Sequence, residues 1–191
     1  VINEKSKALI IEGKKVFLYA MAPFVTLRCL EQHKCCSAIM KLPINTIVAG
    51  IGLGYADSGP THYATEDVGV LKNIIGANIF TASDGNSAKM IAKTLVKKNI
   101  FSFTRLERLP IKQIYQKNEL SLIDINRGYK IFKSKIKTNL RKNLIISNGY
   151  QIHRIFELFE KKKIKYPEQF DIVDLFKNEP FPISLIKILN N

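Results

Sequence analysis

The sequence predicts an α/β protein built on a parallel sheet, followed by an incomplete second α/β unit. Short apolar runs of strand length alternate with segments of helical spacing, and glycine- and proline-rich turns separate them. Such alternation implies parallel strands joined by helical crossovers. Apolar residues make up 46% of the 191 residues, so the chain can form a core of ordinary size.

The first strand is expected at residues 14–20, where the apolar run KKVFLYA follows a Glu-Gly pair. A helix is expected over residues 24–40, because apolar side chains recur there at helical spacing and prolines bound the segment. Residues 45–49 form the second expected strand, which runs into a glycine-rich loop over residues 50–62.

The next helix is expected to have Thr65 as its N-cap and to extend to about Ile74. Glu66 and Asp67 would lie in its first turn, where the helix dipole favours negative charge. This position explains the two carboxylates better than a role in acid–base catalysis does.

Two further strands are expected at residues 78–82 and 100–104. A helix over residues 88–98, capped by Asp84 or Ser87, would connect them. These elements complete the alternation expected of the first domain.

Functional sites in parallel sheets gather in loops beyond the carboxyl ends of the strands. The loop 50–62 and Arg105 both follow expected strands directly. We therefore expect both to reach the same edge of the sheet.

The second unit is expected to be partial. Residues 1–110 would form the first domain, residues 111–142 a linker and residues 143–191 the second unit. The elements of this unit are a strand, a helix and a strand over residues 143–147, 151–163 and 170–175, followed by an apolar terminal helix.

The chain carries a net charge of +14, from 30 Lys and Arg against 16 Asp and Glu. Its densest basic runs, residues 133–137 and 160–163, lack the interleaved aromatic residues that stack on bases. We therefore expect solvated basic faces or attraction of anionic metabolites, and no nucleic-acid partner. No apolar run approaches the ~20 residues of a membrane span, and no secretory segment is present.

The three cysteines, Cys29, Cys35 and Cys36, lie in one short segment. Their odd number and the adjacent pair argue against a disulfide framework, and their spacing does not match a zinc site. Free thiols in a reducing cytosol are the expectation, which predicts a cytoplasmic protein.

Several motifs occur in an order that resembles the pyrimidine-binding domain of transketolases. They are EGKKVFLYAMAPF, RCLEQ, GIGLGYADSGPTHYATEDVGVLKNI, ASD and FTRLER, over roughly residues 1–110. The most specific piece is Gly-Pro-Thr-His followed by Glu-Asp. The segments LIISNGYQIHRIFELFEKK and DIVDLF are similar to the opening of the family's C-terminal domain.

The resemblance implies an enzyme that transfers a two-carbon ketol unit between sugar phosphates with thiamine diphosphate. In this family a glutamate bonds a ring nitrogen of the aminopyrimidine and favours its imino tautomer, whose nitrogen acts as the base. A carboxyl group in an apolar interface has the raised pKa that this role requires. The cofactor supplies the electron sink, and the protein supplies orientation and electrostatics.

Carried to this chain, the resemblance implies roles for four residues. Glu4 resembles the catalytic glutamate that also binds the cofactor, although it lies closer to Glu12-Gly13 than in the family. Phe24 resembles the aromatic residue that packs on the aminopyrimidine. His62 resembles the histidine that contacts sugar hydroxyls and handles protons, and Arg105 resembles the arginine that binds the substrate phosphate.

Each of these residues has a structural alternative. Glu4 would be an exposed N-terminal residue and Phe24 a core residue. His62 would be bonded within its own loop. Arg105 would pair with Glu107 or another nearby carboxylate.

Two departures put the sugar specificity in doubt. Ser58 stands where the family has an acidic residue just before Gly-Pro-Thr-His, with Asp57 one place earlier. Gly50 stands at about the position of a second family histidine.

The other half of the family's site is not found in this sequence. The diphosphate-binding domain carries a Gly-Asp-Gly motif and an asparagine that hold the metal, and no Gly-Asp-Gly occurs here. The chain also lacks the first strand and helix of the pyrimidine-binding domain and most of the C-terminal domain. A separate diphosphate-binding subunit that shares thiamine diphosphate and holds magnesium is therefore expected, in a dimer or heterotetramer, and a truncated chain fits equally well.

Three other functions remain open. A degenerate, non-catalytic docking subunit would fit the shortened segment around Glu4. A relative acting on another acceptor, such as a deoxyxylulose-phosphate synthase, would share the cofactor, although the Gly-Pro-Thr-His wording favours transketolase. A nucleic-acid-binding module would fit the net charge alone.

Overall fold

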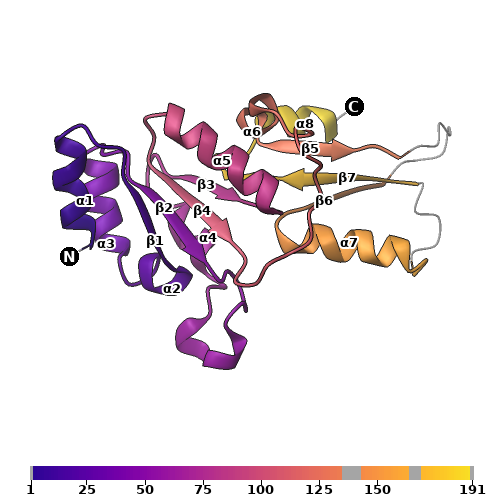
Figure 1. The fold of residues 1–191 in the computed structure, drawn as a ribbon, viewed down its shortest axis with the longest axis horizontal. Helices are drawn as coiled ribbons and strands as arrows, with labels where there is room; N and C mark the ends of the chain where they lie inside the picture. The colour runs from indigo at the N-terminus through magenta and orange to yellow at the C-terminus, as the bar shows by residue number, and fades with distance from the viewer. Residues whose placement is uncertain (1, 135–142, 164–168, 190–191) are drawn as a thin grey trace.

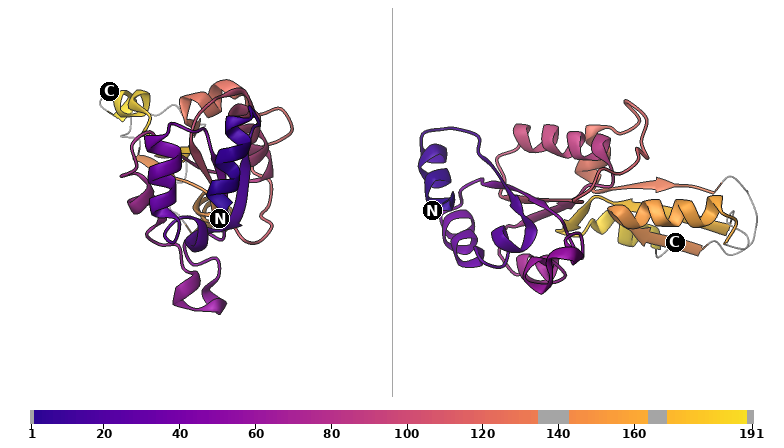
Figure 2. Two further views of the ribbon diagram at one scale, coloured as in Figure 1. Left: turned by 90° about the vertical axis from the view of Figure 1, so that its left-hand side faces the viewer. Right: turned by 60° about the horizontal axis from the view of Figure 1, so that its bottom comes forward.

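The computed structural model describes residues 2–134, 143–163 and 169–189. These residues form two sheets that lie end to end along the long axis of the molecule, as Figure 1 and the right view of Figure 2 show. The mixed α/β architecture with a mainly parallel sheet confirms the predicted fold class. Among the helices that the structure describes, none combines the length and apolar character needed to cross a membrane.

The first sheet has the strand order β1-β2-β4-β3-β8. Its first four strands are parallel, and β8 pairs with β3 in the antiparallel direction. Met21, Ala49 and Leu106 lie side by side where β1, β2 and β4 end, which fixes the carboxyl edge of the sheet. The bounds of these strands are β1 Phe17–Met21, β2 Asn45–Ala49, β3 Asn78–Thr81, β4 Ser102–Leu106 and β8 Lys177–Glu179.

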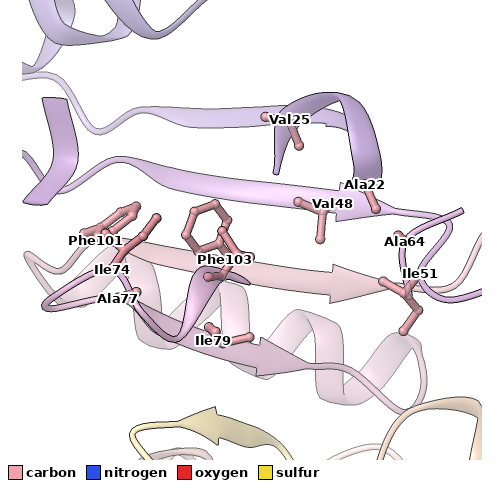
Figure 3. Packing of buried hydrophobic residues seen from close by; sticks show 11 residues of the cluster. Ala22, Val25, Val48, Ile51, Ala64, Ile74, Ala77, Ile79, Phe101 and Phe103 are labelled. Carbon is pink, nitrogen blue, oxygen red and sulfur yellow. The ribbon is translucent and has the colours of Figure 1, made fainter. Parts of the chain in front are cut away.

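Helical segments cover both faces of this sheet. On one face, buried residues of β2, β3 and β4 pack against α2, α3, η1 and α4, and Figure 3 shows part of this cluster around Val48, Phe103 and Ile79. On the other face Phe80 packs with α5 and α6. The bounds are α1 Ile2–Ile11, α2 Ala22–Val25, α3 Leu30–Gln32, the π-helix η1 His33–Ile39, α4 Asp67–Leu71, α5 Gly85–Lys97 and α6 Leu122–Arg127.

The expectation of one helix over residues 24–40 is wrong, because α2 ends after one turn. The Thr26 hydroxyl donates to the Ala22 carbonyl at 2.7 Å. His33 is fully buried between Phe101 and Phe103, and its Nε2 lies 2.7 Å from the Val25 carbonyl oxygen. The imidazole thus takes up a carbonyl group that a continuous helix would use, and its burial lowers the pKa of His33.

The second sheet has the order β5-β7-β6, with β6 parallel and β5 antiparallel to β7. Its elements are β5 Tyr129–Phe132, β6 Asn143–Ser147, α7 Tyr150–Glu160, β7 Phe170–Leu175 and α8 Ile183–Leu189. Both α6 and β5 arise from the segment expected to be a linker, so this segment adds a strand to the second sheet.

A buried carboxylate joins the two units. Asp174 of β7 is fully buried and accepts hydrogen bonds from the Ser83 hydroxyl at 2.6 Å and the Tyr115 hydroxyl at 2.7 Å. The Ser83 oxygen in turn accepts from the Gly149 amide at 3.1 Å. Burial is the main cause that raises the pKa of Asp174 to about 7.

Candidate functional site

The candidate site lies at the carboxyl edge of the first sheet. β1 leads directly into α2, β2 leads into the loop 50–62, and β4 leads into Glu107 and Arg108. Segments that follow parallel strands meet at one edge, where α/β proteins place their sites. This arrangement agrees with the expected position of the loop.

The loop 50–62 projects from this edge, as Figure 1 and the left view of Figure 2 show in purple. Gly50 has a φ of +74°, and a Cβ atom there would lie 2.0 Å from Cε2 of Tyr55. Only glycine therefore allows the Tyr55 ring to pack in this place. Gly52 and Ala64 form a β-bridge at the base of the loop.

Two of the predicted site residues touch each other. The rings of Phe24 and His62 meet edge to face with their centroids 5.0 Å apart. Nδ1 of His62 lies 3.0 Å from the Thr61 hydroxyl, and the guanidinium of Arg28 lies 4.1 Å from the centroid of Phe24. The ring of Tyr55 is 6.4 Å from that of His62, so an aromatic row extends from α2 into the loop.

Arg105 lies inside β4 and is almost fully buried. Its Nε and Nη2 donate to the two carboxylate oxygens of Asp67 at 2.8 Å and 3.0 Å, and its Nη1 donates to the Thr81 hydroxyl at 2.9 Å. Every nitrogen of the guanidinium is thus engaged. The carboxylate that pairs with Arg105 is Asp67, whereas Glu107 was the partner named in the sequence-based alternative.

The first turn of α4 explains how Asp67 reaches Arg105. The N-cap of α4 is Glu66, and no side chain caps it, so the expectation that Thr65 is the cap is wrong. Asp67 is buried, and its carboxylate also accepts the Val68 amide at 2.7 Å. A first-turn carboxylate thus serves as the counter-ion of a buried strand arginine.

The backbone of Glu4 belongs to α1, which packs on η1. The side chain of Glu4 lies outside what the structure describes. Its role therefore stays a prediction.

Arg108 is a residue that the sequence reasoning missed. It follows the end of β4, its Cζ lies 4.4 Å from the centroid of Tyr55, and its Nη1 donates to Oδ1 of Asp57 at 2.5 Å. Unlike Arg105, it is exposed. The signal that could have found it is its place one residue beyond Glu107, outside the strand, where a side chain is free to face a loop.

An open cleft of about 580 Å³ lies beside these residues. Burial raises the pKa of Glu107, the half-buried carboxyl in its wall, although a backbone hydrogen bond with Tyr150 opposes this shift. The cleft is lined by Ile51, Gly52, Leu53, Gly54, Arg105, Glu107, Arg108, Leu109, Pro110, Ile111, Asn148, Tyr150 and Gln151.

The residues at this edge fit one part of thiamine diphosphate and not another. Phe24 and His62 offer a half-buried aromatic surface of the kind that packs on an aminopyrimidine ring. Within the described ranges, no group of three or more His, Cys, Asp and Glu side chains could hold a metal ion. The diphosphate and its metal therefore have no ligand set among these residues.

Comparisons with known proteins agree with this geometry. A family model described as the transketolase pyrimidine-binding domain matches residues 8–109. The chain is 22% identical over 178 residues to a putative transketolase C-terminal section from Methanocaldococcus jannaschii, covering 92% of this chain and 53% of the relative. It is 25% identical over 173 residues to transketolase-like protein 1 from Mus musculus, covering 90% and 27%.

Solved structures share the fold. A split-gene transketolase, described as an inactive beta4 tetramer, matches with a TM-score of 0.75 at 17% identity, over 95% of this chain and 56% of that chain. Transketolase from Leishmania mexicana matches with a TM-score of 0.70 at 16% identity, over 87% and 24%. This chain thus spans about half the length of the first of these relatives and about a quarter of the second. Since the family model covers more than half of its residues, the chain belongs to the family of the transketolase pyrimidine-binding domain.

Proposed function

We propose that the chain supplies the pyrimidine-binding half of a transketolase-like active site, which transfers a two-carbon ketol unit between sugar phosphates. The observation that carries this proposal is the contact between Phe24 and His62 at the carboxyl edge of the sheet. Two residues on different elements, each proposed for the site on separate grounds, meet where a family site is expected.

In this proposal Phe24 packs on the aminopyrimidine ring, and Glu4 bonds a ring nitrogen. Bound thiamine diphosphate supplies the nucleophile and electron sink of the reaction. His62 contacts the sugar hydroxyls and moves protons there, which suits a side chain that titrates near neutral pH. The hydrogen bond between Nδ1 and Thr61 leaves Nε2 as the atom for this work.

Arg108 is the better candidate for the substrate phosphate. The guanidinium of Arg105 is committed to Asp67 and Thr81, and releasing it would leave a buried carboxylate without its counter-ion. Arg108 is exposed, lines the cleft and can offer charge-assisted hydrogen bonds to a phosphate. Arg105 then holds β4, β3 and α4 together behind the site.

A second subunit completes the site in this proposal. It binds the diphosphate and magnesium, and the two chains assemble as a dimer or heterotetramer in the cytoplasm. The descriptions of two relatives, a C-terminal section and a split-gene transketolase, support this division. The chain by itself is then inactive.

The test is reconstitution. The chain is mixed with a diphosphate-binding transketolase subunit, thiamine diphosphate and magnesium, and ketol transfer from a ketose phosphate to an aldose phosphate is followed. Activity is expected only in the complete mixture. His62→Ala is expected to lower kcat/KM by about 10²–10⁴-fold, whereas His153→Ala, in α7, serves as a histidine control. A complex that forms without ketol transfer would support the docking-subunit alternative instead.

A further inference from the structure

Arg108 is held entirely by one short stretch of the glycine-rich loop. Its Nη1 donates to Asp57 at 2.5 Å and to the Gly54 carbonyl at 3.4 Å, and its guanidinium lies over the Tyr55 ring. Three contacts of different kinds, from residues 54–57, thus fix one exposed side chain. An exposed arginine without such contacts would sample many rotamers.

These contacts leave one edge of the guanidinium open. Within the part of the chain that the structure describes, Nε and Nη2 of Arg108 make no hydrogen bond. These two nitrogens form the fork that binds two oxygens of a phosphate or carboxylate at once. Since Arg108 lines the cleft, the open fork belongs to the wall of the candidate site.

The platform under Arg108 is itself fixed. The Tyr55 ring packs on Gly50, where any Cβ would clash with it, and Gly54 packs on the Gly50 backbone at a distance of 3.0 Å from an added Cβ. The loop therefore holds Tyr55 in one place. Hydrogen bonding with Arg108 lowers the pKa of Asp57, so this carboxylate stays ionised at neutral pH.

A similar arrangement elsewhere in the chain shows what is different here. Arg127 also pairs with an aspartate, Asp124, at 2.8 Å, and lies 4.9 Å from the centroid of Tyr129. However, its Nη2 binds Asp124 and its Nε binds the Tyr129 carbonyl at 3.2 Å, so its fork is filled. The fork of Arg105 is filled by Asp67. Of these three arginines, only Arg108 is anchored through Nη1 with the fork free.

We propose that Asp57 and Tyr55 are positioning residues, which hold Arg108 so that its Nε–Nη2 edge receives the anionic end of the substrate. The inference rests on the proposed function, because that function supplies the phosphate. It assigns Asp57 to the arginine rather than to the sugar hydroxyls. It also explains how an acidic residue can stand beside a phosphate site, since its charge is used to orient the guanidinium.

The test measures binding of inorganic phosphate to the full chain, without cofactor or partner, by NMR titration of the Arg108 Nε–H resonance or by calorimetry. Asp57→Asn and Asp57→Ala remove the same charge, but only asparagine keeps an oxygen that accepts from Nη1. We expect the Asn variant to bind phosphate about three- to tenfold more tightly than the Ala variant, the range of one hydrogen bond. Tyr55→Phe should bind as wild type does, and Tyr55→Ala should bind more weakly.

Arg108→Lys, which keeps the charge and removes the fork, should also weaken binding, whereas Arg127→Lys, the matched control, should not. Thermal unfolding of each variant checks that the loop variants remain folded. Equal affinities of Asp57→Asn and Asp57→Ala, or no phosphate binding by the folded wild-type chain, would overturn the inference.

The reconstituted enzyme separates this result from the proposed function. There Asp57→Ala should raise KM for the sugar phosphate relative to Asp57→Asn, with little change in kcat. If the phosphate pattern holds and ketol transfer never occurs, the inference stands and the proposed activity fails. If the enzyme is active and the Asn and Ala variants have equal KM, the inference alone fails.

Discussion

At the scale of single residues, two arginines three positions apart have opposite surroundings. Arg105 is enclosed and bound through both carboxylate oxygens of Asp67, whereas Arg108 is exposed and bound to Asp57. Side-chain exposure is 11% and 1% for the first pair and 34% and 65% for the second. Because a buried charge without its partner costs far more than an exposed one, the two pairs have different roles.

We expect Asp67→Asn to lower the free energy of unfolding by roughly 3–5 kcal/mol, because Arg105 would remain buried without a counter-ion. The measurement is equilibrium urea unfolding of the free chain. Asp57→Asn, at the exposed pair, is the matched control and should leave the midpoint nearly unchanged. Similar midpoints for the two variants would contradict the structural role of Arg105.

The sequence could predict the residue types of the site but not their division of labour. The resemblance to transketolases led to Phe24 and His62, which the structure brings into contact. It could not separate Arg105 from Arg108, because strand ends cannot be located to within two residues from sequence. The expected strand ended at Arg105, whereas β4 continues to Leu106 and places Arg105 in the interior.

At the scale of elements, local signals predicted the regular strands well and the irregular segments poorly. β2 covers the residues expected for it, and Asp84 caps α5 as proposed. The break after α2 depends on the burial of His33 against Phe101 and Phe103, residues almost 70 positions away. β8 carries no apolar alternation, so its pairing with β3 had no signal in the sequence.

The cap of α5 has a second task. Asp84 accepts the Ser87 amide through Oδ1 at 2.7 Å and the amides of Ile114 and Tyr115 through Oδ2, both at 2.9 Å. Asp84→Ala should therefore cost more than the ~1 kcal/mol of an ordinary cap, at roughly 2–4 kcal/mol.

Urea unfolding measures this difference. Ser121→Ala, at the exposed capping box of α6, is the control and should cost about 1 kcal/mol. Equal losses at both caps would show that the bonds of Asp84 to residues 114 and 115 add nothing.

At the scale of the whole molecule, the junction between the two sheets depends on a buried acid. The raised pKa of Asp174, about 7, lies well above the value of roughly 4 expected for an unfolded chain. The folded chain therefore binds this proton more tightly than the unfolded chain does. The stability that the group contributes is complete below about pH 4 and is lost as the pH rises through 7.

Asp174→Asn cannot titrate, so the melting temperature of wild type relative to this variant should fall between pH 5 and pH 8. Differential scanning calorimetry of both proteins across this range measures the difference, in which the titration of the other groups largely cancels. Asn keeps oxygen and nitrogen atoms near Ser83 and Tyr115, so the variant should fold. A difference that does not change with pH would contradict the raised pKa.

The crossing of β8 to the first sheet has a consequence for anyone who dissects this protein. The Thr81 hydroxyl that accepts from Arg105 donates to Oδ1 of Asn178 at 2.5 Å, so the tail of the chain backs the arginine behind the cleft. A fragment cut near residue 110 would leave β3 as a bare edge, which invites pairing with foreign strands. Biochemists who want an autonomous cofactor-binding module should therefore keep the C-terminal tail, although the sequence places it in another domain.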